Sequence, residues 1–281
     1  MVGACFALTP LGLAQVSVEV ALDQDQFLAG ESLEVGVRIT NFSGQTLHLG
    51  KDKDWLRFNL EGKDNYVVPM TGDVPVEGEF DVDSSTVVTR RVDLAPSFAL
   101  TRPGRYTVTA TVRIKELDRE FLGKPKPFDV IAGTKLWEQD VGVPGPAGQP
   151  TEVRKYALQQ AIHLKQLRLY VRVSDAAETR IFRVFPVGPL ISFSQPEHQI
   201  DPSSNLHLLY QTGARSFNYS VVNPDGRLLV RQTYDYTETR PGLRVDREGR
   251  IFISGGVRRP AQDDLPPPSD ASTHESRTPK P

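Results

Sequence analysis

A short acidic run is the first feature of the sequence that could bind a ligand. Four carboxylate residues alternate with other residues along it: Glu77, Glu79, Asp81 and Asp83. In a strand, alternate residues share one face, so the run would place these carboxylates together. Calcium prefers several such hard oxygen ligands, and the run is therefore a calcium candidate. The alternative is a solvated edge strand whose charges prevent pairing with another sheet.

Two histidines and an aspartate form a second group. His198, Asp201 and His207 fall within ten residues, and imidazole with carboxylate is a ligand set that suits zinc. A turn sequence at 201–204 separates them, and their spacing gives neither the i,i+4 pair of a helix nor the i,i+2 pair of a strand. Surface histidines, or core histidines with satisfied hydrogen bonds, explain this group better.

Tyrosines form the third group. Tyr234 and Tyr236 alternate and would share one face of a strand, and Tyr210 and Tyr219 fall in neighbouring predicted strands. An exposed aromatic face binds sugars or peptide side chains by stacking and by apolar burial. We therefore interpret these tyrosines as a candidate binding face. The alternative is ordinary core packing, since alternating aromatic residues in strands usually point inward.

The remaining sequence argues against catalysis. It contains no glycine-rich phosphate loop, Walker lysine, nucleophile elbow, His-Glu-x-x-His or EF-hand pattern. One cysteine excludes a disulfide scaffold and a cysteine-based zinc site. Its 33 basic and 35 acidic residues give a formal net charge of −2, unlike the basic excess of a nucleic-acid-binding protein. We expect a non-catalytic protein without a cofactor, although dispersed carboxylates can act without a local motif.

Strict alternation predicts the elements of the first half. Apolar residues occupy every second position in 16–22, 33–39 and 106–112. This period of two is typical of strands buried on one face, as in a sandwich. Turn sequences at 41–44 and 102–105 separate such strands. The spacing predicts an immunoglobulin-like β-sandwich over residues 15–132.

The second half is predicted to be β-rich as well. Residues 133–152 are rich in proline and glycine toward their end, which indicates a linker or long loop. Residues 152–165 fit helical and alternating spacing alike, and we assign them to a short helix. Five strands then follow: 167–173, 181–187, 206–211, 217–222 and 228–234. They predict a smaller antiparallel β-meander domain over 153–259, so that the whole chain is mainly β.

The two ends of the sequence carry further expectations. Residues 1–14 are apolar and end in Gly12-Leu13-Ala14 before Gln15, which fits a signal peptide too short to span a membrane. Val2-Gly3-Ala4-Cys5 is similar to a lipobox, so lipid anchoring at Cys5 is one alternative and a first buried strand is another. Residues 260–281 hold six prolines and predict a disordered tail. We expect a periplasmic or extracellular protein without a transmembrane span.

Several stretches resemble known families. AGESLEVGVRITNFSGQTLHL and RPGRYTVTATVRI resemble strands of bacterial secreted immunoglobulin-like domain proteins of unassigned function, and similar stretches occur in a proteinase inhibitor family. The resemblance implies that the Tyr106 hydroxyl bonds to an upstream backbone group, as in a tyrosine corner. NLHLLYQTGARSFNYSVVNPDGRLLVRQTY resembles an isolated β-propeller blade, but about two such units are fewer than a closed propeller needs.

Together these patterns favour a non-catalytic exported protein that binds or scaffolds at the bacterial cell envelope. The expected partner is an envelope polysaccharide or another protein, and not a nucleic acid. One alternative is a proteinase-inhibitor-like module whose segment 69–79 projects into a protease cleft. Another is a carbohydrate-active enzyme that uses dispersed carboxylates.

Overall fold

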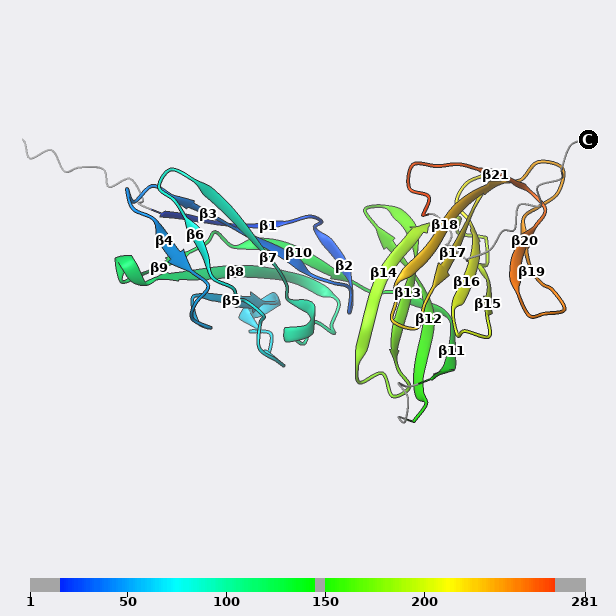
Figure 1. Cartoon of the computed structure of the whole chain (residues 1–281), viewed down its shortest axis with the longest axis horizontal. Coiled ribbons are helices and arrows are strands. Elements are labelled where there is room, and N and C mark those ends of the chain that lie inside the picture. Colours follow the sequence, from blue (N-terminus) through cyan, green and yellow to red (C-terminus); the bar gives the residue numbers. More distant parts are fainter. Residues whose placement is uncertain (1–15, 145–149, 266–281) are drawn as a thin grey trace, which may run out of the picture. The chain divides into compact units, whose positions relative to one another are not determined.

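The computed structural model describes residues 16–144 and 150–265 of the chain. The expected signal peptide with Cys5, and residues 266–281 of the expected tail, lie outside the described residues. The chain divides into two compact units, 1–131 and 132–281 (Figure 1). Within the described ranges the structure is mainly β, and helices are limited to short 3-10 turns. Among the described residues, none of the helices has the length and apolar composition needed to span a membrane.

Unit 1 contains two main sheets and a two-stranded pair. The smaller main sheet has the order β1-β3-β7, with β1 (Val16–Leu22), β3 (Glu34–Asn41) and β7 (Val87–Asp93). The larger one has the order β2-β10-β8-β5, and β9 also pairs with β8. Its strands are β2 (Gln26–Leu28), β10 (Lys126–Ile131), β8 (Gly104–Ile114), β5 (Leu56–Glu61) and β9 (Arg119–Leu122). The remaining elements are the pair β4 (Leu47–Leu49) and β6 (Phe80–Val82), with η1 (Lys63–Asn65), η2 (Ala95–Ser97) and η3 (Lys115–Leu117).

One hydrophobic core lies between the two main sheets of unit 1. Val35 and Val37 of β3 and Val108 and Val112 of β8 are all fully buried within it. The alternation in the sequence predicted these inward positions, because strands with one buried face repeat every two residues. The prediction for Tyr106 is also confirmed, since its hydroxyl donates to the Arg102 carbonyl at 2.8 Å.

Unit 2 contains two larger sheets and a two-stranded pair. The first sheet follows chain order, with β11 (Thr134–Val143), β12 (Glu152–His163), β13 (Gln166–Asp175) and β14 (Ile181–Pro189). The second has the order β15-β16-β17-β18-β21, with β15 (Glu197–Ile200), β16 (Leu206–Gln211), β17 (Ser216–Val222), β18 (Leu228–Asp235) and β21 (Val257–Arg259). The pair consists of β19 (Gly242–Val245) and β20 (Ile251–Ser254).

The structure of unit 2 corrects several expectations. Both larger sheets are antiparallel meanders, and they enclose a core of their own rather than forming a single meander. Strand β11 replaces most of the expected linker, and β12 replaces the expected short helix. The expected tail begins too early, because the Leu265 amide still donates to the Arg231 carbonyl of β18 at 2.9 Å.

The turn between β17 and β18 has the sequence Asn223-Pro224-Asp225-Gly226. The Gly226 amide donates to the Asn223 carbonyl at 2.9 Å, and Gly226 has a φ of 76°. Glycine adopts this left-handed conformation without the steric cost of a Cβ. The turn therefore fixes the register of the two strands that carry Tyr219 and Tyr234.

Candidate functional site

The acidic run is spread over several local environments. Only residues 80–82 of this stretch form a strand, so the four carboxylates do not share one strand face. Glu77 pairs with Lys53 at 3.5 Å, and Asp81 lies 2.7 Å from His48 Nδ1. The Thr46 hydroxyl donates to Asp83. Across the described residues, no group of three or more His, Cys, Asp or Glu side chains is placed to hold a metal ion.

The four tyrosines do not form one face. Tyr210 is opposite Asn218 in the β16–β17 register, so Tyr210 and Tyr219 point to opposite sides of the sheet. Tyr210 is buried in the core between the two larger sheets, and its hydroxyl donates to the Val187 carbonyl at 2.7 Å. Tyr219 and Tyr234 belong to a cluster on the other face of the sheet, and Tyr236 is 40% exposed beyond the end of β18.

Asp201, His207 and Tyr219 form a hydrogen-bonded chain on that other face. His207 Nδ1 lies 2.7 Å from the Tyr219 hydroxyl, and His207 Nε2 lies 3.1 Å from Asp201 Oδ2. Asp201 also accepts hydrogen bonds from the backbone and side chain of Asn205. The sequence therefore placed Asp201 and His207 in one group correctly, whereas His198 lies elsewhere.

The environment of Asp201, His207 and Tyr219 determines which of their atoms carry protons. Burial opposes ionisation of Asp201, but hydrogen bonds from Asn205 and His207 outweigh it and lower the pKa of Asp201. Burial lowers the pKa of His207, with Asp201 opposing that change. Burial also raises the pKa of Tyr219. A neutral His207 therefore donates from Nε2 to the carboxylate and accepts the Tyr219 proton at Nδ1.

A cavity of about 460 Å³ adjoins this chain of hydrogen bonds between Asp201, His207 and Tyr219. Its lining includes Ser203, Asn205, Val221, Val230, Gln232 and Ile251. Both nitrogens of His207 and the proton of Tyr219 are already used inside the protein, and Tyr219 is not activated as a phenolate because its pKa is raised. The arrangement is therefore better suited to holding the β16–β17 pair and the turn at 201–205 together than to proton transfer.

A second cavity in unit 2, of about 340 Å³, lies where the two larger sheets meet. We call it the Trp137 cavity, and it is lined by Leu136, Trp137, Leu158, Gln160, Ser192, Phe193, Ser194, Gln195, Pro196 and His198. The Trp137 ring packs on the His198 ring with 4.1 Å between centroids. This contact joins β11 of one sheet to β15 of the other.

A β-bulge directs the side chains of β11 toward the Trp137 cavity. The β11–β12 register skips Leu136, so that Lys135 pairs with Gln159 and Trp137 with Leu158. Consecutive residues of a regular strand point to opposite faces, but a bulge re-aims them. Leu136 and Trp137 therefore both line the cavity.

The lining of the Trp137 cavity combines aromatic rings with neutral polar groups. Phe193 is 84% exposed at its rim. His198 Nδ1 lies 3.3 Å from the Pro196 carbonyl, which can only accept, so Nε2 of the neutral ring is an acceptor. Gln160 and Ser192 add amide and hydroxyl groups. None of the lining residues carries a carboxylate or a permanent positive charge.

Sequence reasoning missed this cavity for identifiable reasons. Trp137 lies in the segment that was expected to be a linker, and most side chains of β11 are exposed, so the segment shows little apolar alternation. The available signal was that Trp137 is one of only two tryptophans. His198 was noted only as part of a group with Asp201 and His207, whereas in the structure it contacts Trp137 and the Pro196 carbonyl.

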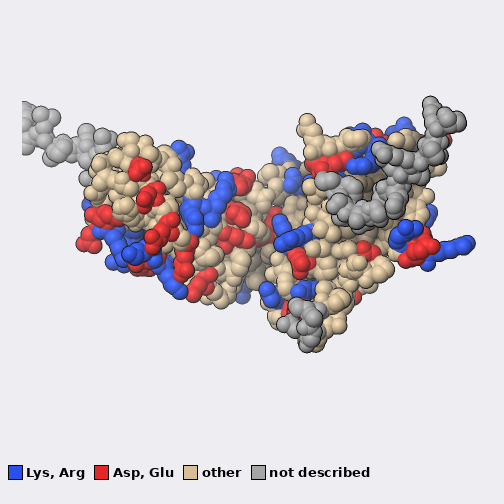
Figure 2. Space-filling model, viewed as in Figure 1, with Lys and Arg blue, Asp and Glu red and all other residues tan. Residues whose placement is uncertain are grey.

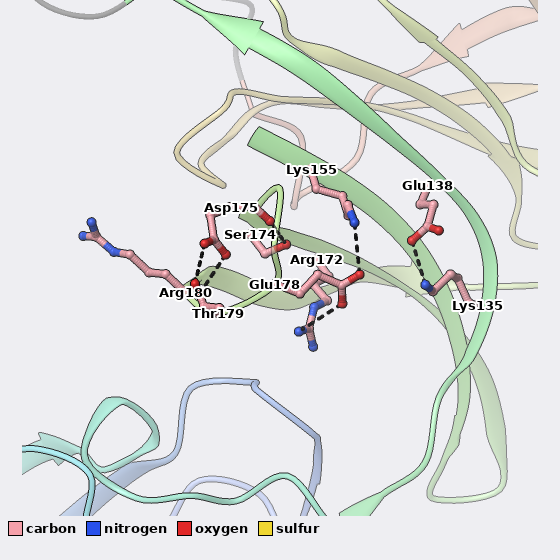
Figure 3. A network of polar contacts seen from close by, with 9 residues as sticks. All are labelled: Lys135, Glu138, Lys155, Arg172, Ser174, Asp175, Glu178, Thr179 and Arg180. Carbon is pink, nitrogen blue, oxygen red and sulfur yellow. Dashed lines mark hydrogen bonds and ion pairs between the residues drawn. The ribbon is translucent and has the colours of Figure 1, made fainter. Parts of the chain in front are cut away.

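Charged side chains are organised into local networks elsewhere. On the face of the β11–β14 sheet that points away from its core, Glu178 contacts Lys155 at 3.3 Å and Arg172 at 3.7 Å (Figure 3). Asp175 accepts from the Thr179 hydroxyl and the Arg180 amide, which closes the β13–β14 turn. On the face shown in Figure 2, acidic and basic side chains are interspersed in both units.

Segment 69–79, which was expected to project as an inhibitory loop, is tied to the body of unit 1. The Thr71 amide donates to the Ser97 carbonyl at 2.9 Å. Val76 is buried, and its carbonyl accepts from Trp55 Nε1 at 2.8 Å. These contacts hold the segment against neighbouring elements over much of its length.

Comparison with known proteins gives little similarity. No family model matches the chain, and no curated protein gives a significant match. Among solved structures, the sporulation control protein Spo0M from Bacillus subtilis is similar at 10% sequence identity and a TM-score of 0.30. The match covers 60% of this chain and 83% of that chain. A TM-score of this size does not establish a shared fold.

Proposed function

We propose that the chain is a non-catalytic, exported saccharide-binding protein whose binding site is the Trp137 cavity. The observation that carries the proposal is the combination of the Trp137–His198 ring pair with uncharged amide and hydroxyl groups. A sugar ring has an apolar C–H face that packs on an aromatic ring, and hydroxyl groups that exchange hydrogen bonds with amides and imidazole. A neutral envelope polysaccharide has this chemistry.

The same lining favours binding without cleavage. Hydrolysis of a glycosidic bond generally uses two carboxyl groups separated by about 5–9.5 Å. None of the residues lining the Trp137 cavity has a carboxyl group. The cavity therefore has groups to recognise a sugar ring but lacks the acid and base that would break its linkage.

Unit 1 serves in this proposal as an immunoglobulin-like scaffold. Two facts support the assignment: a single core lies between its two main sheets, and Tyr106 donates to a carbonyl four residues upstream. Export would deliver the protein to its polysaccharide. Fractionation with amino-terminal sequencing tests this part, since cleavage by signal peptidase would leave Gln15 as the first residue and lipidation would leave Cys5.

The binding experiment uses neutral hexasaccharides of glucose, mannose, xylose and N-acetylglucosamine. Trp55 is buried in unit 1, so the Trp55→Phe variant leaves Trp137 as the only source of tryptophan emission. We expect at least one hexasaccharide to shift that emission and to release heat in calorimetry. Absence of binding by every hexasaccharide would overturn the proposal.

Matched variants locate the site. Phe193→Ala should weaken binding about tenfold, which corresponds to about 1.4 kcal/mol. Phe42→Ala is the control, because Phe42 is a 60% exposed phenylalanine in unit 1. Trp137→Ala should abolish binding, and Trp137→Phe keeps a ring in case the alanine variant unfolds. Unchanged binding in both the Phe193→Ala and Trp137→Phe variants would show that the sugar binds elsewhere.

A further inference from the structure

Unit 1 contains a cavity of about 560 Å³ that is independent of the proposed saccharide site. One wall is the end of β5 near Leu56, Arg57 and Phe58. The opposite wall is segment 70–77, which contributes Met70, Asp73, Val74, Pro75, Val76 and Glu77. Lys53 completes the lining.

This cavity lies along the edge of β5 rather than over one face of the sheet. Leu56 is buried in the core of unit 1, whereas Arg57 points to the opposite face, where it pairs with Glu120. Side chains from both faces of a strand line one cavity where the cavity lies beside the strand rather than over one face of the sheet. The cavity therefore occupies the position where a further strand would pair with β5.

Backbone groups of β5 face this position without a partner. β5 is the last strand of its sheet. The Trp55 carbonyl accepts from the Arg113 amide of β8, whereas the Leu60 carbonyl accepts from the Val68 amide on the other side of β5. Because strand peptide groups alternate in direction, those of Leu56 and Phe58 also point away from β8. Within the described residues, no backbone hydrogen bond to their outer side is found.

Residues 67–68 begin such a strand beside β5, but the residues that follow turn away from the edge of β5. Val67 pairs with Glu61 in an antiparallel bridge, and Val68 bonds to Leu60. Pro69 follows, which has no amide proton to donate, and Met70 pairs with Phe98 instead of β5. The cavity opens at this point of divergence. An incoming chain would therefore continue the pairing that residues 67–68 start.

We propose that this cavity binds an extended peptide of a partner protein, which adds to β5 as a short strand. Leu56 is only 2% exposed, so the accessible unpaired peptide groups are those of the half-buried Phe58. They define the occupant as a polypeptide backbone, as in other proteins that bind peptides by strand addition. Phe58, Val74 and the buried Val76 provide apolar contacts. The peptide therefore carries apolar side chains at alternate positions.

The test uses heptapeptides selected from a random phage library on the full chain, then resynthesised. Hydrogen exchange should show that the peptide slows exchange of the Phe58 amide by at least tenfold. Each peptide is also made in two forms, N-methylated at odd or at even positions. Only one form should lose binding, because only one edge of the added strand faces β5.

Variants of the protein complete this test. Val74→Asp should weaken peptide binding more than tenfold, and Val87→Asp, at a 45% exposed position of β7, should leave it unchanged. The inference fails if no peptide is selected, or if both N-methylated forms bind equally. It also fails if the Phe58 amide becomes protected only as the concentration of the chain rises, because the occupant would then be a second copy. Saccharide binding at Trp137 is unaffected by any of these outcomes.

Discussion

His207 Nδ1 lies 2.7 Å from the hydroxyl of Tyr219, and this contact makes the stability of unit 2 depend on pH. Burial lowers the pKa of His207 below 6.5, so the folded state binds its proton less readily than the unfolded chain. The contribution of His207 to the free energy of unfolding is fully present above pH 6.5. It is lost as the pH falls from 6.5 toward the lower pKa of the folded state. Protonation also makes Nδ1 a donor, so it can no longer accept from Tyr219.

His207→Gln tests this relation, because it removes the titration but keeps a polar side chain. We expect urea unfolding of the wild-type chain to show a free energy that decreases from pH 7 to pH 5, and the variant to show a smaller decrease. Protonation of His48 has the opposite effect on stability, because its hydrogen bond with Asp81 raises its pKa. His48 is present in both the wild-type chain and the variant, so its effect is the same in both profiles. Parallel pH profiles would contradict the neutral state assigned to His207.

Tyr210 and Tyr236 should respond differently to substitution. Tyr210 is 1% exposed and belongs to the core between the larger sheets of unit 2. Replacing a large buried aromatic side chain by alanine costs about 3–5 kcal/mol, so Tyr210→Ala should lower the free energy of unfolding by that amount. Tyr236→Ala should change it by less than about 0.5 kcal/mol. Urea denaturation measures both, and similar losses would mean that Tyr236 also belongs to the core.

The tyrosines show where sequence periodicity stops being informative. In β8, buried Val108 and Ala110 alternate with the partly exposed Thr107 and Thr109, so the period of two identifies the inner face. In β16, all residues from Leu206 to Tyr210 are buried. A strand that is covered on both faces loses the alternating pattern, and the face to which Tyr210 points could not be read from sequence.

The strands β11 and β12 were missed for related physical reasons. β12 buries the three consecutive residues Tyr156, Ala157 and Leu158, which removes the alternation and leaves spacing that also fits a helix. β11 has the opposite property, because it is an edge strand with mostly exposed side chains. Its pairing depends on backbone hydrogen bonds with β12, and a bulge at Leu136 has no simple sequence signature. The Trp137 cavity therefore became visible only in three dimensions.

Tyr106→Phe measures the hydrogen bond that was predicted from the sequence of unit 1. The substitution removes only the hydroxyl that donates to the Arg102 carbonyl at 2.8 Å. A typical hydrogen bond contributes about 0.5–1.5 kcal/mol, so we expect a loss of about 1 kcal/mol in urea unfolding. Tyr66→Phe is the control, since Tyr66 is 46% exposed, and its change should stay below about 0.5 kcal/mol. Equal changes would show that the Tyr106 hydroxyl adds no specific stability.

Alanine substitutions at Gly226 and Gly44 distinguish the energetic cost of backbone strain from the cost of a steric contact. Both have a left-handed φ, 76° and 82°, so alanine at either position costs about 1–2 kcal/mol. A Cβ at Gly44 would meet nothing within 4 Å, whereas one at Gly226 would lie 2.6 Å from the Cβ of Arg183. A Cβ is fixed by its own backbone, so β14 and the turn at 223–226 would have to move apart.

We therefore expect Gly226→Ala to cost more than Gly44→Ala, by about 1–3 kcal/mol, which is typical of overpacking. Urea unfolding of both variants gives the difference, and Gly44→Ala supplies the backbone cost alone. Arg183→Ala does not relieve the contact, because alanine keeps the Cβ. Arg183→Gly in the Gly226→Ala background removes it and should recover part of the loss, after allowance for the cost of Arg183→Gly alone. Equal losses in the two glycine variants would mean that the turn does not pack against β14.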